Sequence, residues 1–322
     1  MPTDNTQTPL RLGVVGSGIM GANHARIASN AAGIELVAVF DPDHDRAEKL
    51  AVAYGAVAVH DVNEMARLVD AAVVATPTEF HAPIAHQLLA AGVDVLVEKP
   101  IAPDVDTGRR LVDAAEAAGR VLMVGHVERF NPAVLELNSL LDEVVHVEAR
   151  RISSYSPRIR DDVVIDLMIH DLDLVMMIAG GAPTEVMSVI RSPRSASADI
   201  ASALIGFDNG VTASLTASRV GQNKIRQIEV TQANDYVVLD LLRQDVTVNR
   251  VERSEFLSDH GQRYRQVGVV EVPFLEHRGE PLALELGHFA DCVRTRSVPS
   301  VSGMDGVRAL DLALRVAAVP SR

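Results

Sequence analysis

The segment Gly16-Ser17-Gly18-Ile19-Met20-Gly21 constrains the fold of this chain more than any other feature. It follows an apolar run at residues 12–15 and opens a segment of helical spacing at residues 20–32. The first glycine permits a tight turn, the second lets a ligand approach the backbone, and the third lets helix and strand pack closely. The chain is therefore expected to begin with a strand, a tight turn and a helix whose free N–H groups face a phosphate.

Apolar runs alternate with helical segments throughout the first 125 residues. The predicted strands lie at residues 12–15, 34–40, 71–75, 93–97 and 121–124. The predicted helices lie at residues 20–32, 43–54, 62–69, 80–91 and 104–118. Strands that are apolar throughout, with helices between them, are typical of a parallel sheet covered on both faces. We predict a doubly wound α/β domain, a Rossmann fold that binds a dinucleotide, over residues 1–125.

An acidic residue, Asp41, follows the third glycine by about 20 residues, at the end of the second predicted strand. A carboxylate there accepts hydrogen bonds from the ribose hydroxyls of a dinucleotide and repels a 2′-phosphate. Arg46 could offset that repulsion, but Asp43 and Asp45 compete for it. NAD is therefore favoured over NADP. The predicted cofactor-binding residues in this part of the chain are Gly16, Gly18, Ile19, Met20, Gly21 and Asp41.

Two further predicted strands end in polar residues. Thr76-Pro77 follows the strand at residues 71–75, and Glu98-Lys99-Pro100 follows the strand at residues 93–97. Because ligands of open α/β sheets bind at the carboxyl ends of the strands, we expect Thr76, Pro77, Glu98 and Lys99 at the cofactor site. A lysine at the end of a mostly apolar strand cannot stay buried and unpaired, so Lys99 is expected to point into the ligand crevice. The alternative is a surface ion pair between Lys99 and Glu98.

Beyond residue 125 the pattern changes, which indicates a second domain over residues 126–322. Helices are predicted from Asn131-Pro132 and at residues 162–179, 282–295 and 304–317. Strands, most of them with a two-residue period, are predicted at residues 144–152, 185–191, 200–207, 211–220, 227–231, 236–241, 246–251 and 266–272. This pattern predicts an α+β domain with an open, mostly antiparallel sheet and helices on one face. The other face needs a cover, so a homodimer or homotetramer is expected; the last helix could pack on the first domain.

Asp166 and His170 lie one turn apart on the helix predicted at residues 162–179, among mostly apolar neighbours. Buried polar groups normally have hydrogen-bond partners or a functional role. A histidine that titrates near neutrality suits a general acid or base, and a carboxylate beside it can orient the ring. Three interpretations remain open here: a catalytic pair, a structural pair with its hydrogen bonds satisfied, and a metal site. No third metal ligand is evident, so no metal is expected.

In this order, the glycine segment, Glu98-Lys99-Pro100 and Asp166-x-x-x-His170-Asp171 resemble the glucose–fructose oxidoreductase/inositol dehydrogenase/MocA family along essentially the whole chain. The resemblance implies an oxidoreductase in which Lys99, Asp166 and His170 meet at the nicotinamide. It implies a sugar, a cyclitol or a close derivative as the substrate, and it places His81 near the cofactor, where a capping or surface role is the alternative. Residues 125–132 and 156–171 are most similar to the branch of UDP-N-acetylglucosamine 3-dehydrogenases.

Four arginines around the domain junction, Arg129, Arg151, Arg158 and Arg160, could bind the diphosphate of a nucleotide sugar. For each of them, a surface ion pair with Asp161, Asp162 or Glu148 is the alternative. The predicted substrate-binding residues are Arg129, Asn131, Arg158 and Asp171, of which Asp171 could equally serve packing or capping.

Composition limits the partners and the location of the protein. The formal net charge of −13 argues against nucleic acid, and the single cysteine, Cys292, excludes an intrachain disulfide. We expect no membrane span and no signal peptide, and hence a cytoplasmic protein.

Two kinds of rival function are compatible with the same fold. The first is another enzyme of the same family, either an inositol or free-sugar dehydrogenase or an NADP-dependent keto-sugar reductase. The second is a regulator that binds a dinucleotide without turnover.

Overall fold

The computed structural model describes residues 8–156, 162–250, 256–259, 262–265 and 268–318. The chain forms two compact units. The first unit combines Met1–Phe130 with Gly279–Asp311, and the second combines Asn131–Arg278 with Leu312–Arg322. The segment Gly279–Asp311, which the sequence assigns to the second domain, therefore belongs with the dinucleotide-binding fold.

The first unit contains a six-stranded sheet in the order β3-β2-β1-β4-β5-β6, and every pair of neighbours is parallel. Its strands are β1 (Leu10–Val15), β2 (Ile34–Phe40), β3 (Val57–Ala58), β4 (Ala71–Val74), β5 (Asp94–Glu98) and β6 (Leu122–Gly125). All residues of β4, β5 and β6 are buried, because helices cover both faces. The predicted doubly wound parallel sheet is thus confirmed, and the two-residue strand β3 is an addition to it.

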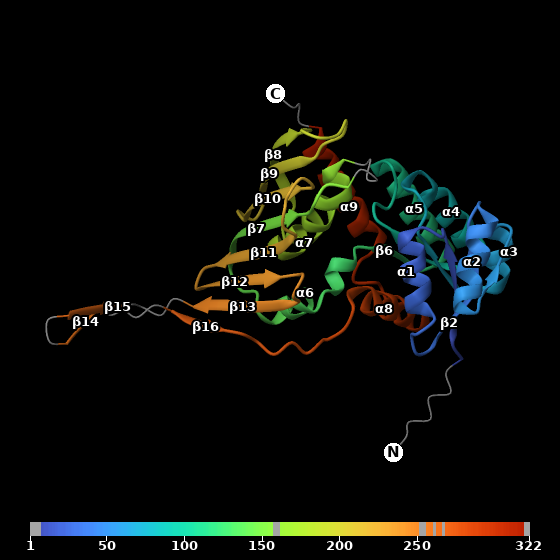
Figure 1. Cartoon of the computed structure of the whole chain (residues 1–322), viewed down its shortest axis with the longest axis horizontal. Helices are drawn as coiled ribbons and strands as arrows, with labels where there is room; N and C mark the ends of the chain where they lie inside the picture. Colours follow the sequence, from blue (N-terminus) through green and yellow to red (C-terminus); the bar gives the residue numbers. More distant parts are fainter. Residues whose placement is uncertain (1–7, 157–161, 251–255, 260–261, 266–267, 319–322) are drawn as a thin grey trace, which may run out of the picture. The chain divides into compact units, whose positions relative to one another are not determined.

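The helices of this unit connect successive strands, as Figure 1 shows for the blue to teal part of the ribbon. They are α1 (Ile19–Ala28), α2 (His44–Tyr54), α3 (Val62–Leu68), α4 (Thr78–Ala90) and α5 (Val105–Ala118), followed by the 3-10 turn η1 (Val127–Phe130). From the C-terminal segment, α8 (Pro281–Thr295) packs against α1 and η1. The last helix, α9 (Gly303–Ala317), begins in the first unit and ends in the second.

The second unit contains an eight-stranded sheet in the order β16-β13-β12-β11-β7-β10-β9-β8. Only the neighbours β7 and β10 are parallel; the other described pairs of this sheet are antiparallel. The strands are β7 (Val144–Ile152), β8 (Pro183–Arg191), β9 (Ile200–Phe207), β10 (Thr212–Ser218), β11 (Ile225–Gln232), β12 (Asp235–Asp240), β13 (Asp245–Arg250) and β16 (Val269–Glu271). The mostly antiparallel sheet of the prediction is confirmed. A separate pair, β14 (Phe256–Asp259) and β15 (Gln262–Arg265), was missed.

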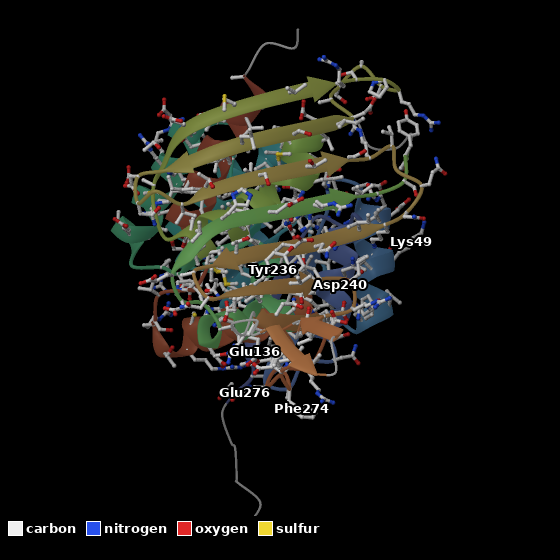
Figure 2. All side chains as sticks on the ribbon, turned by 90° about the vertical axis from the view of Figure 1, so that its left-hand side faces the viewer. Lys49, Glu136, Tyr236, Asp240, Phe274 and Glu276 are labelled. Atoms are coloured by element: carbon white, nitrogen blue, oxygen red, sulfur yellow. The ribbon has the colours of Figure 1, made fainter. Side chains whose placement is uncertain are left out.

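One face of this sheet is covered and the other is open. Alternate residues of β9 and β10, such as Ala203 and Leu215, are buried, and the helix α7 (Ile169–Ala179) packs on β7 and β10. Figure 2 looks onto the opposite face, on which Tyr236 lies. Met187 and Leu204 are paired across β8 and β9 on the open face and are more than half exposed.

Two helices differ from the predicted elements. The helix predicted at residues 162–179 begins as a π-helical turn, η3 (Val164–Met168), and continues as α7. The helix predicted from Asn131-Pro132 is the short α6 (Pro132–Glu136), which the 3-10 turn η2 (Leu137–Ser139) follows. A π turn inside a helix frequently marks a functional position.

Candidate functional site

The glycine segment forms a tight turn between β1 and α1, as predicted. Gly16 has a φ of +99°, and a Cβ at this position would overlap the carbonyl oxygen of Ala75 at the end of β4. A Cβ at Gly21 would overlap the carbonyl oxygen of Gly16, so the helix and the turn are in direct backbone contact. Both positions therefore require glycine for the fold itself.

Gly18 differs from these two glycines, because nothing lies within 4 Å of the position that its Cβ would take. It is the N-cap of α1, where the first N–H groups of a helix lack intrahelical acceptors. Next to it Ile19 is 81% exposed, an unusual environment for an isoleucine. The space over this turn is free for a phosphate and its neighbouring groups.

Two hydroxyl groups beside this turn suit a bound dinucleotide. Among the described residues, Ser17 Oγ in the turn and Thr76 Oγ1 after β4 are buried without a hydrogen-bond partner. Buried hydroxyls normally have partners, and a pyrophosphate or ribose would supply them. Together with the open position at Gly18, they make the residues around this turn fit a dinucleotide.

Asp41 lies directly after β2 and connects that strand to the glycine turn. Its Oδ2 accepts a hydrogen bond from the backbone N–H of Ser17 at 2.7 Å, and its Oδ1 accepts one from Asp43 at 3.0 Å. Each carboxylate oxygen keeps a further lone pair, which a ribose hydroxyl could use. Among the described contacts, the guanidinium of Arg46 forms no ion pair with Asp43 or Asp45; its Nη2 donates to the carbonyl of Ser17 at 3.2 Å, and only the backbone N–H of Arg46 donates to Asp43.

His81 connects the loops that follow β4 and β5. Its Nε2 lies 2.8 Å from the carbonyl oxygen of Thr76, and its Nδ1 lies 2.8 Å from that of Pro100. The ring is buried, so the surface role that the sequence left open is wrong. Since both nitrogens face backbone carbonyls, the geometry supports a bracing role, which keeps the loops containing Thr76 and Lys99 at a fixed separation.

Glu98 is the last residue of β5 and is buried, so the alternative of a surface ion pair with Lys99 is wrong. Its Oε1 lies 2.8 Å from Nε2 of His24 on α1, and its Oε2 accepts a hydrogen bond from the backbone N–H of Lys99 at 3.3 Å. Burial alone would raise the pKa of this carboxyl, but the hydrogen bond and charge of His24, with the charges of Lys99 and His81, lower it. Glu98 therefore carries a negative charge immediately before Lys99.

Asp166 and His170 belong to the second unit and lie on consecutive turns, Asp166 in η3 and His170 in α7. Both are half-buried, whereas Leu172, Leu174 and Val175 on the same helix are fully buried. The backbone N–H of Asp166 donates to the carbonyl of Asp162 at 2.8 Å, and the carboxylate of Asp162 accepts from the N–H of Val164. Asp166 and His170 thus lie on a partly accessible face of a helix that is otherwise buried.

The predicted substrate residues have different surroundings. Asp171 is buried and forms an ion pair with Arg151, whose Nη2 lies 2.7 Å from Oδ1 of Asp171. Asn131 is buried as the N-cap of α6, and its Nδ2 donates to the carbonyl of Leu241 at 3.0 Å. Arg129 in η1 donates to the carbonyl of Ser300 at 3.2 Å. Arg158 and Arg160 lie outside the described residues.

Three charged residues with notable environments were missed. Arg219 and Asp199 form an ion pair with no exposed surface, and Glu285 on α8 is fully buried without a hydrogen-bond partner among the described residues. Glu285 stands in the sequence between Leu284 and Leu286, on an otherwise apolar face. That position was a usable signal, because a carboxylate within an apolar stripe is seldom accidental.

In the described part of the chain, no group of three or more His, Cys, Asp and Glu side chains is arranged to hold a metal ion. The same residues contain no helix with the length and apolar character needed to cross a membrane.

Comparison with known proteins identifies relatives that share this architecture. Residues 10–126 match the family described as an oxidoreductase family with an NAD-binding Rossmann fold, and residues 137–234 match the GFO/IDH/MocA C-terminal domain. UDP-N-acetylglucosamine 3-dehydrogenase of Acidithiobacillus ferrooxidans is 31% identical over 309 residues, which are 95% of this chain and 96% of the relative.

A solved structure of that enzyme aligns with a TM-score of 0.87 at 31% identity and covers 97% of each chain. Inositol 2-dehydrogenase 4 of Saccharopolyspora erythraea is 37% identical over 199 residues, 58% of each chain. These relatives are named as dehydrogenases, and the first extends over both units. The chain therefore belongs to the GFO/IDH/MocA family of NAD-binding oxidoreductases.

Proposed function

We propose that this protein is an NAD-dependent dehydrogenase that oxidises a ring hydroxyl of a nucleotide sugar, with C3 of UDP-N-acetylglucosamine as the first candidate. The observation that carries the proposal is the 31% identity to a UDP-N-acetylglucosamine 3-dehydrogenase over 95% of this chain. The likeness to an inositol 2-dehydrogenase, 37% over 58% of the chain, makes a cyclitol or free sugar the second candidate.

His170 is the proposed general base, which takes the proton of the substrate hydroxyl. Asp166, one turn earlier, is proposed to orient the imidazole and stabilise its charged form. Lys99 is proposed to stabilise the negative charge that develops on the substrate oxygen. The bound dinucleotide supplies the hydride acceptor. In the reverse direction the protonated His170 returns the proton to the same oxygen.

NAD is the proposed cofactor because Asp41 presents a carboxylate beside the glycine turn, where a 2′-phosphate would be repelled. The guanidinium of Arg46 donates a hydrogen bond to the carbonyl of Ser17 in the glycine turn and could offset the repulsion of a 2′-phosphate by Asp41. NADP should therefore be tested as well. NADP with a keto sugar, in the reductive direction, is accordingly the alternative for the same residues.

The decisive experiment is turnover followed by the absorbance of the reduced cofactor, with NAD and NADP separately. The substrates are UDP-N-acetylglucosamine, free glucose and myo-inositol. We expect NADH formation with the UDP sugar and a loss of about 10²–10⁴-fold in kcat for His170→Ala, the range for a missing general base. His60→Ala, which removes an exposed histidine of the first unit, is the matched control and should leave turnover unchanged.

Other outcomes reassign the substrate or the class. Activity with inositol or glucose alone would contradict the nucleotide-sugar assignment and keep the roles of His170 and Lys99. Tight NADH binding with no turnover in either direction would favour a regulator that binds the dinucleotide without chemistry.

We also propose that the open face of the eight-stranded sheet joins copies of the chain into a homodimer or homotetramer. Met187 and Leu204 form an exposed apolar pair on that face. Light scattering on the purified protein should give a multiple of the monomer mass, and Leu204→Glu should reduce it. A wild-type protein that is monomeric at micromolar concentration would contradict the proposal.

A further inference from the structure

Three titratable side chains from distant parts of the sequence are buried inside the first unit, where Nε2 of His24 lies 2.8 Å from Glu98 and the charge of Glu98 acts on Glu285. His24 comes from α1, Glu98 from the end of β5 and Glu285 from α8. His24 and Glu285 have no exposed surface, and Glu98 is 7% exposed. We call these three residues the buried carboxyl cluster. It contains two acidic groups, and the mechanism proposed above uses neither of them directly.

The hydrogen bonds distinguish the two carboxyls of the cluster. Glu98 faces two donors, Nε2 of His24 at 2.8 Å and the backbone N–H of Lys99 at 3.3 Å, which suit a carboxylate. Glu285 has no hydrogen-bond partner on either oxygen among the described residues. An ionised carboxylate without donors in an apolar interior is strongly destabilised, whereas a neutral carboxylic acid is far less so. The cluster is therefore best described by an ionised Glu98 and a protonated Glu285.

The charges around the cluster agree with this assignment. Burial, and then the charge of Glu98, raise the pKa of Glu285 well above its usual value. α8 packs against α1, which carries His24 and Arg26, and against η1, which carries Glu128 and Arg129. Arg26 is engaged by Glu280 at the surface, and His126 precedes η1. Among these groups, the charge that acts on Glu285 is that of Glu98.

His81 contributes a second feature to the environment of Glu98. Both of its ring nitrogens lie 2.8 Å from carbonyl oxygens, which accept hydrogen bonds and cannot donate them. Lys99 and His81 both lie near Glu98, and the charge of each of them lowers the pKa of Glu98.

We propose that the pair of Glu98 and Glu285 carries one proton in total, located on Glu285, and that Glu285 releases this proton to solvent when the oxidised dinucleotide binds and regains it with the reduced form. On release the O–H bond of the Glu285 carboxyl breaks, its electron pair stays on the carboxylate, and the proton goes to the buffer. The inference rests on the proposed function, in which Lys99, adjacent to Glu98, faces the nicotinamide.

Charge is the physical basis of the coupling. The nicotinamide ring is positively charged when oxidised and neutral when reduced. A positive charge added near a buried carboxyl pair favours ionisation of the second carboxyl, because charges act over longer distances in an interior of low dielectric. Glu285 would in this way offset the charge of the oxidised ring beside Lys99 and His81, and its protonation would follow the redox state of the cofactor.

The experiment is isothermal titration calorimetry of the full chain with NAD and, separately, with NADH. Each titration is repeated in phosphate, HEPES and Tris, because the buffer contributes its own heat of ionisation for every proton exchanged. The pH should span about 6 to about 9, which includes the range known for buried glutamic acids. NAD binding should release up to about one proton per site at some pH in this range, and NADH binding should release measurably fewer.

Glu285→Gln keeps the shape of the protonated acid and removes the titration, so the difference between NAD and NADH in proton release should disappear. Asp291→Asn is the matched control, because it removes the same charge from an exposed position of the same helix. It should behave as the wild type. If Glu285→Gln does not fold, equal proton release by the wild type with NAD and with NADH would still overturn the inference.

Equal proton release for NAD and NADH at every pH, or an unchanged difference in Glu285→Gln, would overturn the inference while leaving the proposed dehydrogenase intact. Absence of binding by either form of the dinucleotide would overturn both. Fluorescence of bound NADH separates these two results before any calorimetry is interpreted.

Discussion

Arg219 and Asp199 form an ion pair in which neither side chain is exposed to solvent, with Nε of Arg219 3.0 Å from Oδ1 of Asp199. The same carboxylate accepts hydrogen bonds from the backbone N–H groups of Arg194 and Ser195 and from the Ser195 hydroxyl. Arg219 Nη2 also donates to the hydroxyls of Ser195 and Ser197. Residues of the loop before β9 therefore form hydrogen bonds with both members of one buried ion pair.

This pair also bears on the candidate site. The carbonyl of Ala198, next to Asp199, accepts the backbone N–H of Val163 at 3.1 Å. Val163 immediately precedes the π-helical turn η3 that contains Asp166. The buried pair thus fixes the loop against which the helix with Asp166 and His170 begins, and we regard Asp199 and Arg219 as positioning residues.

The first prediction concerns the removal of one partner. Arg219→Met should lower the free energy of unfolding by about 3–5 kcal/mol, because it leaves the Asp199 carboxylate buried without its cation. Urea unfolding followed by circular dichroism measures the change.

The double variant Arg219→Met/Asp199→Leu should be more stable than Arg219→Met alone, since it leaves no unpaired buried charge. If the second substitution lowers stability further by an additive amount, the two side chains are not energetically coupled and the interpretation is wrong.

The second prediction concerns pH. Burial alone would raise the pKa of Asp199, but hydrogen bonds from Ser195, Arg194 and Arg219 lower it from 3.8 to about 2. A carboxyl with a lowered pKa in the folded state stabilises the protein above its unfolded pKa, and this contribution is lost as the pH falls through the folded pKa. The stability difference between wild type and Asp199→Asn should therefore be constant above about pH 5 and shrink towards about pH 2. A difference that is independent of pH over this interval would contradict the assignment.

The sequence was sufficient to predict the parallel sheet, because its strands are largely buried and read as mostly apolar runs, interrupted by few charged residues such as Glu35 and Asp94. The two-residue strand β3 could not be found in this way, since Val57–Ala58 is too short for any periodicity. The hairpin of β14 and β15 was missed for a different reason: the sequence Phe256–Asp259 has no alternation strong enough to separate a strand from a loop. The π turn at Val164–Met168 was also missed, because an apolar stretch has the same appearance in an α-helix and in a π-helix.

For the candidate site, the sequence predicted the backbone conformation of the glycine motif correctly. It did not predict which side chains form ion pairs with residues elsewhere in the chain. Gly16 and Gly21 have the roles that the motif requires. In contrast, nothing in the sequence indicates that Asp171 pairs with Arg151 or that His24 pairs with Glu98, since each pair joins elements far apart in the chain. Such partners depend on tertiary packing, which short motifs do not encode.

The third prediction contrasts two glycines of the cofactor turn. Gly16→Ala should destabilise the fold by about 1–3 kcal/mol or more, because it forces a left-handed backbone on alanine and overlaps the carbonyl of Ala75. Gly18→Ala should lower the unfolding temperature much less than Gly16→Ala, since its Cβ enters open space and only the preference for glycine over alanine at an N-cap is lost. That space is where the phosphates are expected, so Gly18→Ala should weaken NADH binding by about tenfold or more.

Thermal unfolding of both variants and NADH fluorescence titration of Gly18→Ala provide the test. Unchanged NADH affinity in a folded Gly18→Ala protein would show that the dinucleotide does not approach this turn. A stable Gly16→Ala protein would contradict the close contact between the turn and β4.

The last prediction separates two roles for Asp171. As a substrate ligand it would need a free carboxylate, but Arg151 Nε lies 3.0 and 2.9 Å from its two oxygens, and both side chains are almost fully buried. Asp171→Ala should therefore lower the free energy of unfolding by about 3–5 kcal/mol, and Arg151→Met should recover part of that loss. At a temperature where the variant is fully folded, KM for the substrate should change less than twofold, because a residue that holds α7 against β7 touches no substrate. A variant of wild-type stability with a strongly raised KM would instead return Asp171 to the substrate site and require Arg151 to rearrange when substrate binds.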